Sequence, residues 1–137
     1  MLYLLDTNIC SYILRKRPFE VLERLEKATE HGDEVGLSVV TASELLYGAY
    51  RKQHPRLIEL VRDFLELLPV YPFDLKAAEV YGEIRAILEK KGCPIGPYDL
   101  QIAAHAISKR AVLVTNNERE FRRVPGLRLE NWINPAV

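Results

Sequence analysis

Five short apolar runs alternate along the chain with longer segments in which apolar residues recur at the spacing of a helix. Short apolar runs bounded by turn residues are typical of buried strands. The predicted strands are LYLL (2–5), VGLSVV (35–40), a short strand within LLPVYPF (67–73), AVLVT (111–115) and LRLENW (127–132). The pattern therefore predicts a sheet of about five strands.

Helical segments fill the intervals between these strands. Residues 19–31 place Phe19, Leu22 and Leu25 near helical spacing, and Gly32 is a suitable stop. Further helices are predicted after Asp6 and over residues 41–53, 55–68, 74–91 and 97–110. Strands separated by helices imply right-handed crossovers, so the sequence predicts a three-layer α/β/α fold around a mainly parallel sheet.

Composition limits the size and the class of the protein. The 137 residues, 48% hydrophobic and 28% charged, fit a single domain over residues 1–137. No apolar run is long enough to cross a bilayer and no signal peptide is recognisable, so we expect a cytoplasmic protein without membrane contact. Cys10 and Cys93 lack the spacing of a zinc site or a disulfide framework. The 19 basic and 19 acidic residues cancel, so any nucleic-acid binding would depend on local patches.

Polar side chains follow the predicted strands where each strand ends. Asp6 follows the first strand, Glu44 lies shortly after the second, and Asn117 follows AVLVT. Asp99 opens the helix predicted over residues 97–110. In open parallel sheets, ligands bind beyond the carboxyl ends of the strands, where helices begin. We therefore expect these four side chains to lie along one edge of the sheet.

Each of the four residues also has an ordinary structural explanation. Asp6 and Asn117 suit helix caps or turns. Thr41 and Glu44 match the capping box S/T-x-x-E, so capping and catalysis explain Glu44 equally well when it is taken alone. Asp99 lies in the first turn of its predicted helix, where the helix dipole stabilises a carboxylate. The expected convergence on one edge, and no single residue, favours a functional site.

The residue types at this edge indicate metal-assisted chemistry. Three carboxylates within a few ångströms raise one another's pKa unless a cation compensates their charge. Oxygen-rich clusters without histidine suit Mg²⁺ or Mn²⁺, and such an ion binds phosphate oxygens and activates water. The glycine-rich phosphate loop and the GxSxG nucleophile motif are absent, and we expect His105 to be packed inside its helix. The indicated reaction is phosphodiester hydrolysis.

Four motifs stand in order along the chain: LLDTNI, TASELLYGAYR, GCPIGPYDLQIAAHA and LVTNNEREFRRVPGLRLENW. Together they resemble the PIN-domain ribonucleases and, more narrowly, the VapC toxins of bacterial and archaeal toxin-antitoxin modules, in the family's order and spacing over essentially the whole chain. The resemblance implies that Asp6, Glu44 and Asp99 are the acidic catalytic residues, with Asp6 and Asp99 as metal ligands. The fourth catalytic position falls at Asn117, where many relatives have Asp, so we expect a second metal ion to bind weakly or only with RNA present.

The same resemblance implies an activity and partners. It predicts a metal-dependent endoribonuclease that uses Mg²⁺ or Mn²⁺ and leaves 5′-phosphate and 3′-hydroxyl ends. The expected partners are an RNA substrate, a VapB-like antitoxin and a second copy in a homodimer. DTNICSYILRKRP and TNNEREFRRVPGLRLENW look most like the VapC subgroup that cleaves the anticodon stem-loop of initiator tRNA. The alternative is a non-catalytic PIN-fold module that binds RNA or protein, which Asn117 keeps open.

Two arginine-rich segments are candidates for RNA contact. Both follow elements that begin at the predicted acidic edge, and arginines around an acidic centre hold phosphates without a large net charge. The candidates are Arg15, Lys16, Arg17, Arg119, Arg122 and Arg123. The alternative is a pair of solvated surfaces, the usual place of charge runs. Tyr47, Tyr50 and Tyr98 are candidates for base stacking, with packing in the core or an interface as the alternative for each.

Overall fold

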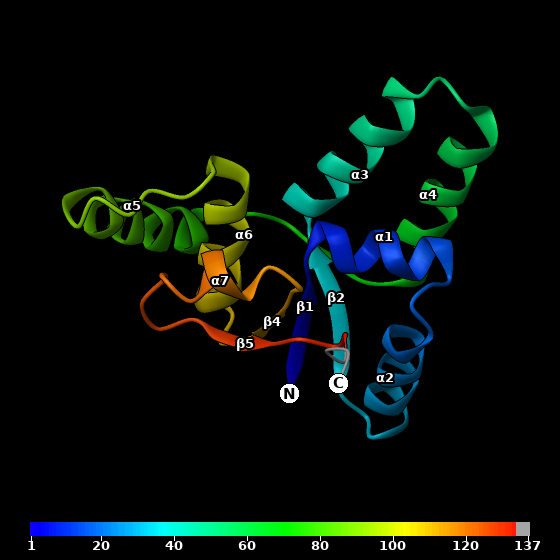
Figure 1. Ribbon diagram of the computed structural model, residues 1–137, viewed down its shortest axis with the longest axis horizontal. Helices are drawn as coiled ribbons and strands as arrows, with labels where there is room; N and C mark the ends of the chain where they lie inside the picture. Colours follow the sequence, from blue (N-terminus) through cyan, green and yellow to red (C-terminus); the bar gives the residue numbers. More distant parts are fainter. Residues whose placement is uncertain (134–137) are drawn as a thin grey trace.

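A parallel sheet runs through the centre of the computed structural model, which describes residues 1–133 (Figure 1). Its strands are β1 (Leu2–Leu5), β2 (Glu34–Ser38), β3 (Val70–Tyr71), β4 (Val112–Val114) and β5 (Arg128–Glu130). The order across the sheet is β3-β2-β1-β4-β5, and every neighbouring pair is parallel. The prediction of a mainly parallel sheet of about five strands is therefore confirmed.

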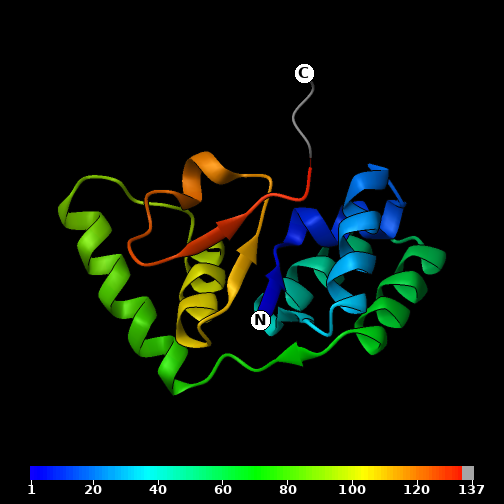
Figure 2. The ribbon, with the colours of Figure 1, turned by 90° about the horizontal axis from the view of Figure 1, so that it is seen from below.

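Helices cover both faces of this sheet (Figures 1 and 2). One group packs on one face, and consists of α1 (Thr7–Arg15), α2 (Phe19–Glu30), α3 (Val39–Arg51) and α4 (Pro55–Leu67). The other group consists of α5 (Leu75–Lys90), α6 (Pro97–Ser108) and the short α7 (Glu118–Phe121). The three-layer α/β/α prediction is confirmed, whereas α7 was not predicted. Within residues 1–133, no helix combines the length and the apolar character that a membrane span requires.

The alternation of side chains along β1 produces two hydrophobic cores. Tyr3 and Leu5 face α1 to α4, and Leu4 points to the opposite side. Leu4 packs there in one cluster with Leu88 of α5 and Phe121 of α7. Because successive residues of a strand point to opposite faces, a strand that is covered on both sides is apolar throughout, as LYLL is. Burial on both faces fixes the register of β1 at the centre of the sheet.

The junction between β2 and α3 differs from the prediction. The strand ends at Ser38, and α3 begins at Val39, two residues before Thr41. Ser38 is the N-cap, because its Oγ accepts a 3.1 Å hydrogen bond from the Val40 amide. The helix thus starts two residues earlier than predicted. The capping box, which was one of two explanations for Glu44, does not form, since Thr41 lies inside the helix with its hydroxyl buried and unpaired among residues 1–133.

A buried histidine contacts Ser38, the N-cap of α3. The Ser38 hydroxyl lies 2.7 Å from His105 Nδ1, and burial together with the charge of Lys109 lowers the pKa of His105. A neutral imidazole has one nitrogen that donates and one that accepts, so in the tautomer with an unprotonated Nδ1 the Ser38 hydroxyl donates to His105 while its oxygen accepts from Val40. This contact ties the start of α3 to α6 across the sheet edge. The His105 side chain is buried, which confirms the prediction that this residue is packed in the protein interior.

Candidate functional site

The predicted site residues gather at the carboxyl edge of the sheet. Since all strands are parallel, α1, α3 and α7 leave from the same edge, and the first turn of α6 is brought to it from the other layer (Figure 1). The charges of Glu44 and Asp6 both raise the pKa of Asp99, and the charge of Glu44 raises that of Asp6. These three acids, which are far apart in sequence, therefore lie within electrostatic range of one another.

Asp6 is a helix cap inside the acidic cluster. Its Oδ1 accepts a 2.9 Å hydrogen bond from the amide of Ile9, and only 4% of the residue is exposed. Burial raises the pKa of Asp6 to about 6, although hydrogen bonds from Thr115 and Ile9 oppose the shift. A carboxylate has about four acceptor sites, so capping α1 leaves capacity for a cation. The structural and the functional explanations of Asp6 are compatible.

Glu44 lies in the middle of α3 and does not cap it. Its Oε1 accepts a 2.7 Å hydrogen bond from the hydroxyl of Thr7, the first residue of α1. The side chain is half-buried and lies 37 residues along the chain from this partner. The contact holds the Glu44 carboxylate beside Asp6, which directly precedes Thr7. The geometry thus removes the capping explanation that the sequence left open for Glu44.

Asp99 faces a fourth acid that the sequence analysis missed. Burial raises the pKa of Asp99 to about 7, and the next causes are a hydrogen bond to Glu120 and the charge of Glu120. A second carboxylate this close disfavours the charged form of Asp99 unless a cation compensates the charge. Glu120 belongs to α7, a four-residue helix that is too short to show a periodic pattern. The signal present in the sequence is the spacing Asn117-x-x-Glu120, which matches a cap and its partner three residues later.

Asn117 supports this fourth acid. It occupies the N-cap position of α7, but its side chain makes no capping hydrogen bond. Its Nδ2 instead donates to Glu120 Oε2 at 3.0 Å, while its backbone amide donates to Thr115 Oγ1 at 2.9 Å. The side-chain amide of Asn117 therefore positions the carboxylate of Glu120. In this arrangement Glu120 offers the negative charge that Asn117 lacks.

The donor atoms of the cluster fit a hard cation. Carboxylate oxygens are the ligands that Mg²⁺ and Mn²⁺ prefer, and Glu120 Oε1 is buried without a hydrogen-bond donor among residues 1–133. In the same part of the chain, no three acidic, histidine or cysteine side chains are grouped closely enough to enclose a metal ion. An ion bound here would therefore rely on one or two carboxylates and several waters, which is the usual coordination of Mg²⁺.

The predicted RNA-contacting residues lie on two sides of the cluster. Arg15, at the end of α1, lines a groove of about 380 Å³ together with Thr7, Glu44 and Arg51. The turn after α1 carries the exposed Lys16 and Arg17, and neither of them lines this groove. In and after α7, Arg119 is exposed, Arg122 lies 3.4 Å from Glu118 and Arg123 donates to the carbonyl of Pro94. Arg15 is thus the candidate that the structure connects most directly with the acids.

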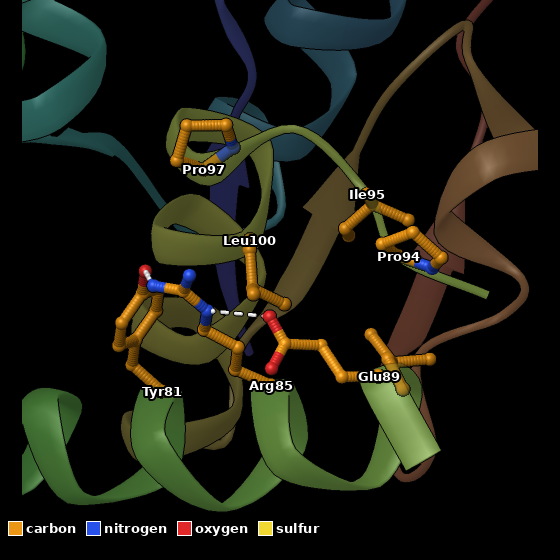
Figure 3. Close-up of a pocket in the computed structure, with 8 residues that line it drawn as sticks. Tyr81, Arg85, Glu89, Pro94, Ile95, Pro97 and Leu100 are labelled. Carbon is orange, nitrogen blue, oxygen red and sulfur yellow. Dashed lines mark hydrogen bonds and ion pairs between the residues drawn. The ribbon is translucent and has the colours of Figure 1, made fainter. Parts of the chain in front are cut away.

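A separate cavity of about 220 Å³ lies between α5 and the loop before α6 (Figure 3). Arg85 donates to Glu89 at 3.1 Å and to the hydroxyl of Tyr81 at 2.9 Å, so its guanidinium is held along α5. Pro97 and Leu100 line the cavity from the first turn of α6. The cavity contains none of the predicted site residues.

Comparisons with known proteins agree with the fold. The PIN domain family matches residues 3–127. Ribonuclease VapC2 of Haemophilus influenzae is 43% identical over 132 residues, which cover 96% of this chain and 98% of that protein. The tRNA(fMet)-specific endonuclease VapC of Salmonella typhimurium is 43% identical over 131 residues, or 95% and 97% of the two chains.

Solved structures give the same result. A chain in the crystal structure of VapBC2 from Rickettsia felis bound to a DNA fragment from their promoter superposes with a TM-score of 0.91 at 41% identity, over 97% of this chain and all of that one. A chain of DNA-bound VapBC from Salmonella typhimurium gives 0.90 at 43% identity with the same coverage. The resemblance drawn from the four motifs is confirmed. The chain belongs to the PIN-domain family and, within it, to the VapC proteins.

Proposed function

We propose that this protein is a metal-dependent endoribonuclease that acts as the toxin of a type II toxin-antitoxin system. The observation that carries the proposal is the cluster of Asp6, Glu44, Asp99 and Glu120 at the carboxyl edge of a parallel sheet, where the pKa values of Asp6 and Asp99 are raised. Like charges are brought together in this way where a cation is to be bound. Close relatives with the names ribonuclease and endonuclease support the same chemistry.

Each acid has a separate task in this proposal. Asp6 and Asp99 hold Mg²⁺ or Mn²⁺, and Glu120 adds negative charge beside Asp99, with Asn117 orienting it. When bound there, such an ion would supply positive charge for the scissile phosphate and would make a water molecule more acidic. Glu44, fixed by Thr7, is placed to accept a hydrogen bond from the attacking water. In-line attack on phosphorus then leaves 5′-phosphate and 3′-hydroxyl ends.

Basic residues hold the RNA backbone in this proposal. Arg15 extends the site along the groove between α1, α3 and α4, and Lys16 and Arg17 continue the positive charge beyond α1. On the other side of the acids, Arg119, Arg122 and Arg123 are placed in and after α7. Phosphate contacts of this kind position the strand and carry no sequence information.

The proposed substrate is the anticodon stem-loop of initiator tRNA in the cytoplasm. Support comes from the Salmonella typhimurium relative, whose name specifies tRNA(fMet), and from the unpaired bases and bent backbone that such a loop exposes. A VapB-like antitoxin is a proposed partner, since the structural relatives are VapBC complexes. A homodimer is proposed from the resemblance to the VapC family. We expect expression without the antitoxin to be toxic and light scattering of the purified protein to give the mass of a dimer.

The alternative is a PIN-fold module that binds RNA or protein without cutting it. Its main support was the absence of Asp at position 117. Since Glu120 brings a carboxylate to Asp99, that absence does not leave the cluster short of charge. The nuclease proposal therefore explains the arrangement better.

Cleavage of RNA by the purified protein tests the proposal. Initiator tRNA should be cut in Mg²⁺ or Mn²⁺, and EDTA should stop the reaction. Asp6→Asn and Asp99→Asn should each abolish cutting and leave the fold intact, because Asn also serves as an N-cap at position 6. Full activity of both variants would contradict the assignment of these acids. Sequencing the 5′ ends formed after induction identifies the target, and a dominant cut in another RNA would refute initiator tRNA alone.

A further inference from the structure

A second cavity, which we name the aromatic pocket, adjoins the acidic cluster. It has a volume of about 710 Å³ and lies between α3 and α6. Thr7 and Glu44, which are hydrogen-bonded to each other, form its boundary with the acids. The remainder is lined by Val40, Ser43, Tyr47, Tyr98 and Gln101. The pocket is therefore continuous with the site at which the proposed cleavage takes place.

Two exposed tyrosine rings dominate this pocket. Tyr47 is 67% exposed and Tyr98 is 60% exposed, although both rings are large and mostly apolar. Tyr47 lies three residues after Glu44 on α3, a spacing that places both side chains on the same side of a helix. Tyr98 directly precedes Asp99 on α6. Each ring is thus attached to the same helix as one of the acids.

The third candidate tyrosine is separated from the pocket. Tyr50 accepts a hydrogen bond from Arg62 and lines a different surface, between α3 and α4. An arginine lies over each of these rings: the guanidinium of Arg51 is 5.9 Å from the centre of the Tyr47 ring, and that of Arg62 is 5.9 Å from the centre of the Tyr50 ring. The two tyrosines therefore differ in their location, since only Tyr47 lines the aromatic pocket. The structure therefore distinguishes three tyrosines that the sequence could not, and it brings Tyr47 and Tyr98 to the acids.

The polar groups of the pocket match the edge of a nucleobase. Gln101 lines the pocket, and its side-chain amide has two donors and an acceptor. The Ser43 hydroxyl donates to the Val39 carbonyl at 3.0 Å, so its oxygen remains an acceptor. Aromatic faces with a few donors and acceptors between them are the usual means by which proteins bind unpaired bases.

We propose that the aromatic pocket is a base-stacking subsite, in which Tyr47 and Tyr98 hold an unpaired nucleobase of the RNA next to the cleaved phosphodiester. The inference rests on the proposed ribonuclease function and adds a binding site to it. A base held in the pocket fixes the nucleotide whose phosphate lies at Glu44 and Asp99. Stacking tolerates any base, so the pocket selects unpaired over paired nucleotides and leaves the identity of the base to Gln101 and Ser43.

A double-mutant cycle between protein and RNA tests the subsite. The protein variants are Tyr47→Leu and Tyr98→Leu, which remove the ring, and Tyr47→Phe and Tyr98→Phe, which retain it. The RNA variants are oligonucleotides of the cleaved loop with an abasic residue at each position flanking the mapped cut. Each Leu variant should lower kcat/KM on intact RNA by about 5- to 150-fold, the range measured for loss of a stacked base, and each Phe variant should not.

With the wild-type protein, one of the abasic RNAs should lower kcat/KM as much as a Leu variant does on intact RNA. On that abasic RNA, the Leu variants should have the same kcat/KM as the wild-type protein. Tyr50→Leu is the matched control, because it removes an exposed ring from α3 outside the pocket. Equal losses of kcat/KM on intact and abasic RNA, or no loss at all, would overturn the inference, while cleavage by the wild-type protein would still uphold the ribonuclease function.

Conversion of the Leu variants from dimer to monomer, or loss of antitoxin binding with normal RNA cleavage, would assign the pocket to a protein partner instead. A wild-type protein that cuts no RNA would contradict the function and the inference together.

Discussion

The hydroxyl of Thr7 donates a 2.7 Å hydrogen bond to Oε1 of Glu44 and thereby joins the start of α1 to the middle of α3. Thr7 directly follows Asp6, whose carboxylate caps α1. The bond consequently fixes Glu44 relative to Asp6, although the two acids come from different helices. Because the Glu44 carboxylate is engaged by Thr7, it does not cap α3, whose N-cap is Ser38.

We expect Glu44→Gln to abolish RNA cleavage with little change in Tm, because neither helix needs this carboxylate as a cap. Thr7→Val should lower kcat by about 10- to 100-fold, since a hydrogen bond to a charged group contributes roughly 1.5–3 kcal/mol. Single-turnover cleavage and thermal unfolding measure the two effects separately. Thr29→Val is the matched control, because the Thr29 hydroxyl donates to the Leu25 carbonyl within α2. Cleavage at the wild-type rate by Glu44→Gln would show that the carboxylate has no catalytic task.

Glu120 and Asn117 offer a test of which residue provides the fourth polar group. Glu120→Gln should weaken Mn²⁺ binding and cleavage strongly, because it removes the charge that faces Asp99. Asn117→Ala removes only the 3.0 Å hydrogen bond to Glu120, so we expect a smaller loss. Calorimetric titration with Mn²⁺ and cleavage assays compare the two variants. A greater loss in Asn117→Ala than in Glu120→Gln would return the fourth position to Asn117.

Parts of the fold and of the site could be predicted from the sequence where residues adjacent in the chain determine the local structure. Asp6 directly follows a strand that is apolar throughout, and Asp99 lies in the first turn of a helix that begins with Pro97. The position of both residues at the sheet edge could therefore be predicted. The start of α3 could not be predicted, because Ser38 and Thr41 both suit a cap and the choice depends on His105 in another layer. Glu120 could not be predicted either, since only the approach of α7 to α6 brings it to Asp99.

The raised pKa values of the acids predict how stability depends on pH. In the protein without metal, the pKa of Asp6 is about 6 and that of Asp99 is about 7, whereas both are near 4 in an unfolded chain. Between these values the folded protein holds protons that unfolding releases, so the free energy of unfolding falls as the pH rises. In EDTA we expect the Tm to decrease from about pH 5 to about pH 8. Asp99→Asn should reduce this decrease.

Added Mg²⁺ should restore the Tm at the upper end of this range, because a bound cation takes the place of the protons. Asp63→Asn, on the exposed surface of α4, is the control and should leave the pH dependence unchanged. The same Tm at both ends of the range in EDTA would show that the acids are too far apart or too well hydrated to hold extra protons.

Gly36 allows β3 to pair with β2. A Cβ atom at this position would lie 2.7 Å from the carbonyl oxygen of Pro69 and 2.7 Å from Cε2 of Tyr71. Gly36→Ala should therefore lower the free energy of unfolding by about 1–3 kcal/mol, the range for overpacked sites. Gly82→Ala, in α5 with no atom within 4 Å, should instead raise it by about 0.5–1 kcal/mol. Urea unfolding of both variants measures the difference, and equal stability of the two would contradict the close packing of β3 on β2.

Arg15 is the basic residue for which the structure predicts the clearest effect on RNA binding. It lines the groove that begins at Thr7 and Glu44, and it can reach the phosphates of a strand that leaves the acids along α1. Arg15→Ala should raise KM for RNA without lowering kcat, and should reduce the slope of log KM against log salt by about 0.7–0.9, which corresponds to one phosphate contact. Arg56→Ala is the matched control, because Arg56 lies on α4 beside Glu59 and lines none of the cavities described above. A lower kcat with an unchanged salt dependence would show that Arg15 supports the structure of the site and does not bind the RNA backbone.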